Sequence, residues 1–260
     1  MEPLIRLENV ALSHDGGGSF VFRNIDLSVV SGEFIAILGP SGVGKSTLLR
    51  VLMGLVEGSE GRVILSSGSA SKMGGRAALV FQDARLMPWR TVRRNVEFGL
   101  EGIGLSRTER RQRVERALAL VGLADEAGRW PRQLSGGQRQ RVGVARALAV
   151  EPDLLLMDEP FGALDAITRG GLQAELLSIW EKTGKTVIFV THDLDEAILL
   201  ADRIIVLAGS PATVRGDLRV GPRPHDPSSP AMRALAGRLR ALIGGEEDPG
   251  VGPYARFEGI

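Results

Sequence analysis

The most informative segment of the chain reads Gly39-Pro40-Ser41-Gly42-Val43-Gly44-Lys45-Ser46-Thr47. An apolar run, 34–38, comes before it, and a second apolar-rich run, 48–53, follows it. A short buried strand, a glycine-rich turn and a helix start, in that order, are what the pattern G-x-x-x-x-G-K-[ST] requires of a phosphate-binding loop. The glycines let backbone N–H groups turn toward an anion, and the helix N-terminus adds partial positive charge. The segment therefore predicts a phosphate site in which Lys45 reaches the β- and γ-phosphates and the Ser46 hydroxyl takes a Mg²⁺ ion.

Composition limits the classes of protein to which the chain can belong. Its 260 residues, 43% of them apolar, are enough for one or two domains with a sizeable core. The 32 Lys and Arg residues nearly balance 31 Asp and Glu, so overall charge favours no nucleic-acid partner. The sequence contains no cysteine, which excludes disulfides and thiolate metal sites. No signal peptide and no apolar run approaching about 18 residues is evident, so we expect a protein that does not cross a bilayer.

The pattern along the chain predicts an α/β fold. Alternating residues over 4–10 and 21–29 indicate two antiparallel strands ahead of the phosphate loop. Strands that alternate with helices further along imply a mostly parallel sheet. The other expected strands are 61–65, 77–81, 154–157, 186–190 and 203–208, and the expected helices include 168–182, 193–201 and 231–243.

A helical insertion is expected over about 85–150, where hardly any strand pattern occurs. Within it, 107–121 places Val114, Ala117, Leu118 and Val121 on one helix face. The charged opposite face favours solvated surface over a nucleic-acid patch. The expected organisation is thus a nucleotide-binding domain over 1–220, which contains this helical subdomain, and a short C-terminal extension over 221–260.

An acidic pair, Asp158-Glu159, ends the predicted strand 154–157. At the carboxyl end of a buried strand in such a sheet, one carboxylate can hold Mg²⁺ through water while its neighbour orients an attacking water. Asp-Glu is also a common helix start, so the pair alone does not decide its function.

The remaining motifs resolve that ambiguity. They are Leu134-Ser135-Gly136-Gly137-Gln138, Asp158-Glu159-Pro160, Ala163-Leu164-Asp165 and Thr191-His192-Asp193. With the phosphate loop, they resemble the ATP-binding cassette family of transporter ATPases over roughly residues 4–215. The resemblance implies a P-loop NTPase core with a mostly parallel sheet, an antiparallel β subdomain and an inserted α-helical subdomain.

The resemblance also implies roles for single residues. Glu159 matches the catalytic glutamate, His192 a switch histidine that contacts the γ-phosphate, and Gln82 a glutamine at the junction with the helical subdomain. Asp158, with Ser46 and Gln82, is expected on the Mg²⁺ side, and Asp165 in a dimer loop. The signature Ser135, Gly136, Gly137 and Gln138 would meet ATP bound by a second subunit, so that a head-to-tail homodimer, or a heterodimer with a paralogue, encloses two ATP molecules.

One position departs from the family pattern. An aromatic residue after the first strand usually stacks on adenine, and the matching position here is His14. Three readings stay open: His14 stacks less strongly, Phe20 or Phe22 replaces it, or His14 is an ordinary loop residue.

The segment Met87-Pro88-Trp89-Arg90-Thr91-Val92 resembles cassette ATPases of nitrate, sulfonate and taurine importers. In the family this region receives a helix of the membrane subunit, so Trp89 is either an interface anchor or a residue of the subdomain core. The resemblance implies an ATPase at the cytoplasmic face of the inner membrane, with transmembrane permease subunits as partners and a periplasmic solute-binding protein acting indirectly. The alternatives are an exporter or lipid-extraction subunit, or a non-transport cassette ATPase of DNA repair or translation.

Overall fold

The computed structural model describes residues 3–13, 18–65, 77–223, 225–226 and 228–245. They form two compact units, one of residues 1–70 and 190–260 and the other of residues 71–189. None of the helices described has both the length and the apolar character needed to span a membrane.

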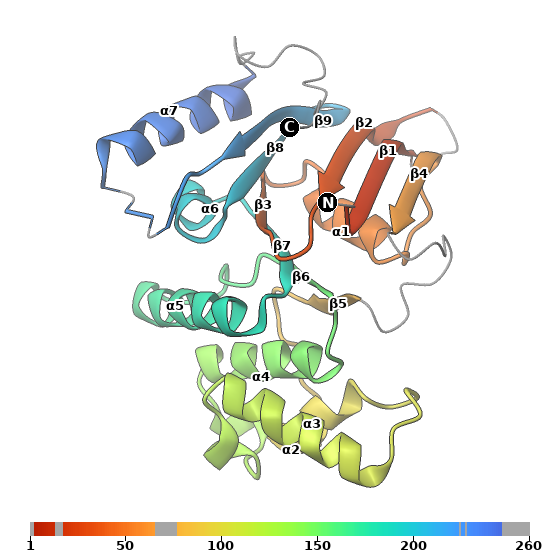
Figure 1. Ribbon diagram of the computed structural model, residues 1–260, viewed down its shortest axis with the longest axis vertical. Helices are drawn as coiled ribbons and strands as arrows, with labels where there is room; N and C mark the ends of the chain where they lie inside the picture. Colours follow the sequence, from red (N-terminus) through yellow and green to blue (C-terminus); the bar gives the residue numbers. More distant parts are fainter. Residues whose placement is uncertain (1–2, 14–17, 66–76, 224, 227, 246–260) are drawn as a thin grey trace. The chain divides into compact units, whose positions relative to one another are not determined.

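Strands β1 (Ile5–Ser13), β2 (Phe20–Val29) and β4 (Glu60–Leu65) form the antiparallel part of the first unit's sheet (Figure 1). Strand β1 pairs with β2 on one side and with β4 on the other. Inward-facing side chains such as Ile5, Leu7 and Ile25 are fully buried, as the alternating pattern requires. The antiparallel strands predicted ahead of the phosphate loop are confirmed.

The rest of this unit's sheet is built around β3 (Phe34–Leu38), which runs parallel to β8 (Arg203–Gly209). Strand β9 (Ala212–Arg219) pairs antiparallel with β8 and continues the order β4-β1-β2-β9-β8-β3. All five residues of β3 are fully buried, so the strand is covered on both faces. Strand β9 was not predicted from the sequence.

Three helices belong to the first unit: α1 (Lys45–Leu52), α6 (Leu194–Leu200) and α7 (Pro230–Gly244). Helix α6 packs against β3, and α7 packs against α6, β8 and β9 (Figure 1). The predicted C-terminal helix is therefore confirmed, and its apolar face contributes Leu239 and Leu242 to the core. The predicted boundary at residue 220 stays a prediction.

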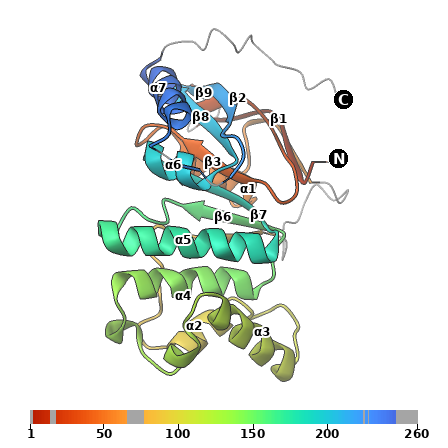
Figure 2. The same cartoon turned by 60° about the vertical axis from the view of Figure 1, so that its left-hand side comes forward.

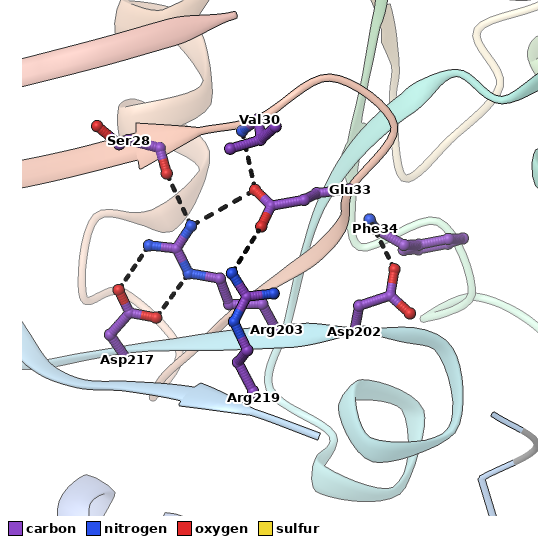
Figure 3. Close-up of polar contacts among 8 residues, drawn as sticks. All are labelled: Ser28, Val30, Glu33, Phe34, Asp202, Arg203, Asp217 and Arg219. Carbon is purple, nitrogen blue, oxygen red and sulfur yellow. Dashed lines mark hydrogen bonds and ion pairs between the residues drawn. The ribbon is translucent and has the colours of Figure 1, made fainter. Parts of the chain in front are cut away.

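A cluster of charged residues links several strands of the first unit (Figure 3). The Arg203 side chain is only 5% exposed and binds both carboxylate oxygens of Asp217 at 2.6 Å. It also donates to the Ser28 carbonyl at 2.7 Å, and lies 3.5 Å from Glu33, to which Arg219 is paired. The buried guanidinium therefore has partners on β2, β9 and the residue that precedes β3.

The second unit contains the strands β5 (Ala77–Val80) and β6 (Leu154–Asp158), which pair in parallel, and most of β7 (Thr186–Thr191). The order within the unit is β7-β6-β5. Leu154, Leu155, Leu156 and Met157 are almost completely buried, in agreement with an apolar run that reads as a central strand.

The helices of this unit are α2 (Val92–Phe98), α3 (Arg107–Leu120), α4 (Gly136–Ala149) and α5 (Ala166–Thr183), with 3₁₀ turns at Ala124–Glu126 and Pro131–Gln133. Helix α4 packs against α2, α3 and α5 (Figure 2). Residues 85–150, all of which the structure describes, contain no strand. The predicted helical insertion is thus confirmed.

Candidate active site

The phosphate loop joins β3 to α1, as expected. The Lys45 side chain is buried and donates to the carbonyls of Gly39 and Pro40, both at 2.9 Å. The ammonium is therefore held over the loop's own backbone, at the N-terminus of helix α1. The first turn of α1 contains no acidic residue. A positively charged side chain at a helix N-terminus favours an anion at this position.

Two glycines of this loop occupy positions where a side chain would be strained or would overlap a neighbour. A side chain on Gly39 would overlap the carbonyl oxygen of Leu207 on β8. Gly44 has φ of 105°, and a Cβ there would lie 2.8 Å from a methyl carbon of Val21. The backbone of the loop is thus packed closely against β8 and β2, which fixes its course.

His192 belongs to the same unit and follows the last residue of β7. Thr191, which is buried, donates its hydroxyl to the carboxylate of Glu196 at 2.7 Å and accepts from the Asp193 N–H at 3.0 Å. Asp193 caps α6 by accepting from the N–H groups of Asp195 and Glu196. The residues on both sides of His192 are therefore anchored, while the imidazole itself is exposed.

The acidic pair lies in the second unit. Asp158 is the last residue of β6, and Glu159 has φ of 43°, a left-handed backbone conformation that non-glycine residues adopt at a cost. A Cβ on Gly162 would lie 3.1 Å from the amide nitrogen of Gln82 and 3.6 Å from a carboxylate oxygen of Glu159. The structure therefore brings Gln82 and Glu159 close to the same position beside Gly162.

The signature begins helix α4. Ser135 is the N-cap, its hydroxyl accepts from the Gln138 N–H at 3.2 Å, and the Gln138 side chain accepts from the Ser135 N–H at 2.9 Å. This capping box defines the helix start. A side chain on Gly137 would overlap the Thr168 methyl group of α5, whereas Ser135 and Gly136 are exposed.

Asp165 is the N-cap of helix α5. Its carboxylate accepts from the Thr168 N–H at 3.0 Å and from the Thr168 hydroxyl at 2.7 Å. The hydrogen bond from the Thr168 N–H contributes most, and that from the Thr168 hydroxyl next, to lowering the pKa of Asp165. The exposed carboxylate therefore stays ionised.

Burial limits which of the three candidate residues, His14, Phe20 and Phe22, can stack on adenine. His14 lies outside the residues that the structure describes. Phe22 is fully buried, so its ring offers no face to a ligand. Phe20 is half-buried, and the Arg23 guanidinium lies 5.1 Å from its ring centre. Phe22 is therefore excluded as the stacking residue in this structure.

The interpretation of Trp89 as a core residue is wrong, because 71% of its surface is exposed. Its neighbour Arg90 forms an ion pair with Glu101 at 2.7 Å and lies over the Phe98 ring at 5.1 Å. Asn95, which sequence reasoning missed, makes four hydrogen bonds to the segment that carries Trp89. A lone asparagine within a helical pattern gave no signal of this role.

A model of the ABC transporter family matches residues 22–162. The match includes the phosphate loop, Gln82, the signature and the acidic pair. The chain belongs to the ABC transporter family. As an ABC transporter ATPase it binds and hydrolyses ATP, which confirms the expected fold and enzyme class.

Among relatives, this ABC ATPase is 49% identical over 226 residues to the aliphatic sulfonates import ATP-binding protein SsuB of Mycobacterium avium, which covers 87% of the chain and 86% of that protein. It is 47% identical over 209 residues to the taurine import ATP-binding protein TauB of Pseudomonas aeruginosa, with 80% of each covered. It is also 46% identical over 206 residues to the nitrate import ATP-binding protein NrtC of Synechococcus elongatus, covering 78% of the chain and 31% of that longer protein.

A solved structure extends the comparison to three dimensions. The ATP-binding cassette MJ0796, a dimer bound to ADP and Pi, matches with a TM-score of 0.70 and 34% identity. The match covers 84% of this chain and 100% of that one. The ABC fold, a largely parallel sheet with antiparallel strands and inserted helices, is therefore shared with a nucleotide-bound cassette.

Proposed function

We propose that this ABC ATPase energises solute uptake of the nitrate, sulfonate and taurine type. It works as a dimer at the cytoplasmic face of the inner membrane, docked on separate permease subunits that receive solute from a periplasmic binding protein. The observation that carries the proposal is the identity of 47% to 49% to sulfonate and taurine import proteins over at least 80% of both chains.

In this proposal each ATP-site residue has a distinct task. Lys45 binds the β- and γ-phosphates, supported by its buried position beside the loop carbonyls. Glu159 orients the attacking water and accepts its proton, and His192 contacts the γ-phosphate. Gln82 lies beside Glu159 at Gly162, which supports a shared task at the water.

Mg²⁺ fits the oxygen donors present. Ser46, Gln82 and Asp158 offer a hydroxyl, an amide oxygen and a carboxylate, the hard ligands that Mg²⁺ accepts. Among the described residues, no three His, Cys, Asp or Glu side chains gather into a metal-holding group. When bound, Mg²⁺ would neutralise charge that develops on the phosphates.

The dimer is supported by the exposed helix start at the signature. Ser135 and Gly136 lie at the N-terminus of the 14-residue helix α4, where backbone N–H groups favour an anion. The γ-phosphate bound by the second subunit is the anion proposed for this position. Asp165, whose carboxylate stays ionised, and the 90% exposed Ile167 begin α5 close to the signature helix and complete the proposed dimer surface.

For the base of the nucleotide, Phe20 or His14 is proposed to stack on adenine.

Permease docking is assigned to Gln82, Leu86, Met87, Trp89 and Arg90. Trp89 presents an exposed indole, and Arg90 is held by Glu101 and Phe98 in a defined orientation. Exposed tryptophan and arginine residues are the side chains that dominate interface energies. We expect about 2 kcal/mol of permease binding to depend on Trp89.

The test compares two exposed apolar residues. Trp89→Ala should reduce co-purification with the permease and abolish ATP-driven uptake into proteoliposomes, while ATP binding stays normal. Leu55→Ala, in the other unit and 63% exposed, is the control and should leave all three unchanged. Wild-type behaviour of Trp89→Ala would place the docking surface elsewhere. Transport only in the outward direction by the reconstituted complex would exclude the importer.

A further inference from the structure

We propose that Asn95 is a positioning residue that holds the segment Met87–Thr91 in the shape that presents Trp89 to the permease. The inference rests on the proposed docking function and adds the residue on which the docking surface depends. Asn95 does not touch ATP or the partner; it acts through the backbone of the segment that carries Trp89.

Asn95 lies on α2 and is completely buried. Its Oδ1 accepts from the Met87 N–H at 2.7 Å. Its Nδ2 lies within hydrogen-bond distance of the carbonyls of Met87, Arg90 and Thr91, at 3.2, 3.0 and 3.1 Å. One side chain therefore fixes backbone groups at the first, fourth and fifth residues of this segment.

An asparagine is required because the segment offers both a donor and several acceptors. An amide supplies an acceptor oxygen and two N–H donors, so the two protons are shared among three carbonyls. An aspartate in the same place keeps the acceptor and loses the donors, and an alanine loses both. Pro88, inside the segment, has no N–H and limits the hydrogen bonds that the backbone can make by itself.

The consequence for Trp89 is pre-organisation. A large indole that is 71% exposed on a loose loop would lose conformational entropy when a partner binds. Asn95 fixes the backbone on both sides of Trp89 when the protein folds. Less conformational entropy is therefore lost when the permease binds.

The residues just before this segment are tied to the signature helix. On α4, Gln140 donates to the Phe81 carbonyl at 2.9 Å, and Arg146 donates to the carbonyls of Ala84 and Arg85 at 2.5 and 3.2 Å. Helix α4 therefore holds the chain just before the segment Met87–Thr91, α2 holds the segment itself, and Gln82 lies between Phe81 and Ala84. A change in the shape of the segment is expected to weaken docking without removing any ATP ligand.

The experiment measures permease affinity, ATP affinity and the unfolding midpoint for Asn95→Ala and for a matched core variant. Val114 on α3 is buried, and its apolar side chain cannot hydrogen-bond to the segment, so Val114→Ala provides a destabilised control. We expect Asn95→Ala to weaken permease binding about tenfold with ATP affinity unchanged. Val114→Ala should lower the unfolding midpoint and leave permease binding unchanged. Equal losses in the two variants, or wild-type permease binding by Asn95→Ala, would overturn the proposal.

A second measurement needs no partner. In a chain with Trp130→Phe and Trp180→Phe, Trp89 is the sole tryptophan. Asn95→Ala, or Asn95→Asp if the alanine variant does not fold, should lower the fluorescence anisotropy of Trp89; an unchanged anisotropy contradicts the role of Asn95. This result is independent of docking, which Trp89→Ala tests separately. If Trp89→Ala binds the permease normally, Trp89 has no docking function. If Trp89→Ala weakens permease binding and Asn95→Ala does not, the docking function stands and only the positioning role of Asn95 is contradicted.

Discussion

Gln82 and Glu159 approach the same point beside Gly162, the position that a Cβ atom on this glycine would occupy. A methyl group there would lie 3.1 Å from the Gln82 amide and 3.6 Å from the Glu159 carboxylate. We therefore predict that Gly162→Ala lowers kcat about tenfold or more, because the new methyl group displaces the Gln82 amide beside Glu159, and leaves ATP affinity unchanged. Gly170→Ala on α5, with nothing within 4 Å of the new methyl, is the control and should keep full turnover.

Lys45 provides the second prediction. Lys45→Ala should weaken ATP binding by about tenfold to a hundredfold, because the phosphates lose a charged hydrogen-bond donor. Lys185→Ala, outside the loop, is the control for the loss of one positive charge. Calorimetric titration of both variants with ATP decides the matter, and an unchanged ATP affinity in Lys45→Ala would show that the loop does not bind the phosphates as described.

Substitutions of the signature residue Ser135 should distinguish ATP binding by the monomer from dimer assembly. Ser135→Arg should leave ATP binding by the monomer close to normal and prevent ATP-dependent dimerisation, since the bulky cation would occupy the place of the second subunit's nucleotide. Ser135→Ala, which removes the hydroxyl and with it the helix cap, at a cost of about 1 kcal/mol, but adds no bulk, is the smaller control. Light scattering with ATP reports the mass, and a dimer of Ser135→Arg would contradict the proposed interface.

The charged cluster of the first unit predicts a stability effect (Figure 3). Arg203→Leu leaves Asp217 and Glu33 without their buried partner, and should lower the free energy of unfolding by about 3 to 5 kcal/mol. Arg219→Leu removes a 63% exposed guanidinium and should cost less than about 1 kcal/mol. Urea denaturation of the two variants measures both values. Equal effects would mean that burial does not set the importance of Arg203.

Much of the fold follows from local patterns. Phe34–Leu38 and Leu154–Met157 are unbroken apolar runs, so a strand covered on both faces could be predicted for each. Strand β9 was missed although Ala212, Val214 and Leu218 alternate with polar residues, the pattern of a half-buried strand; Gly216 weakens that pattern. Its place depends on pairing with β8 and on the Arg203–Asp217 ion pair, which are contacts between different strands.

The candidate site divides in the same way. The loop 39–47 could be predicted because its glycines, lysine and helix start are contiguous. The meeting of Gln82 with Glu159 at Gly162 depends on how the chain folds, and so does the role of Asn95, whose partners are backbone groups of a loop. Burial decided two open questions, since Phe22 is inside the core and Trp89 is on the surface.

We propose that Glu159 orients the water that attacks ATP, and the variant Glu159→Gln tests this role on a single residue. The substitution keeps size and hydrogen-bonding capacity while removing the base, and Lys45 still holds the phosphates. We predict ATP affinity close to wild type, loss of steady-state turnover and a stable ATP-bound dimer, measured by nucleotide titration, phosphate release and light scattering on one sample. ATP turnover by Glu159→Gln within a few-fold of wild type would contradict the role of Glu159 in orienting the water.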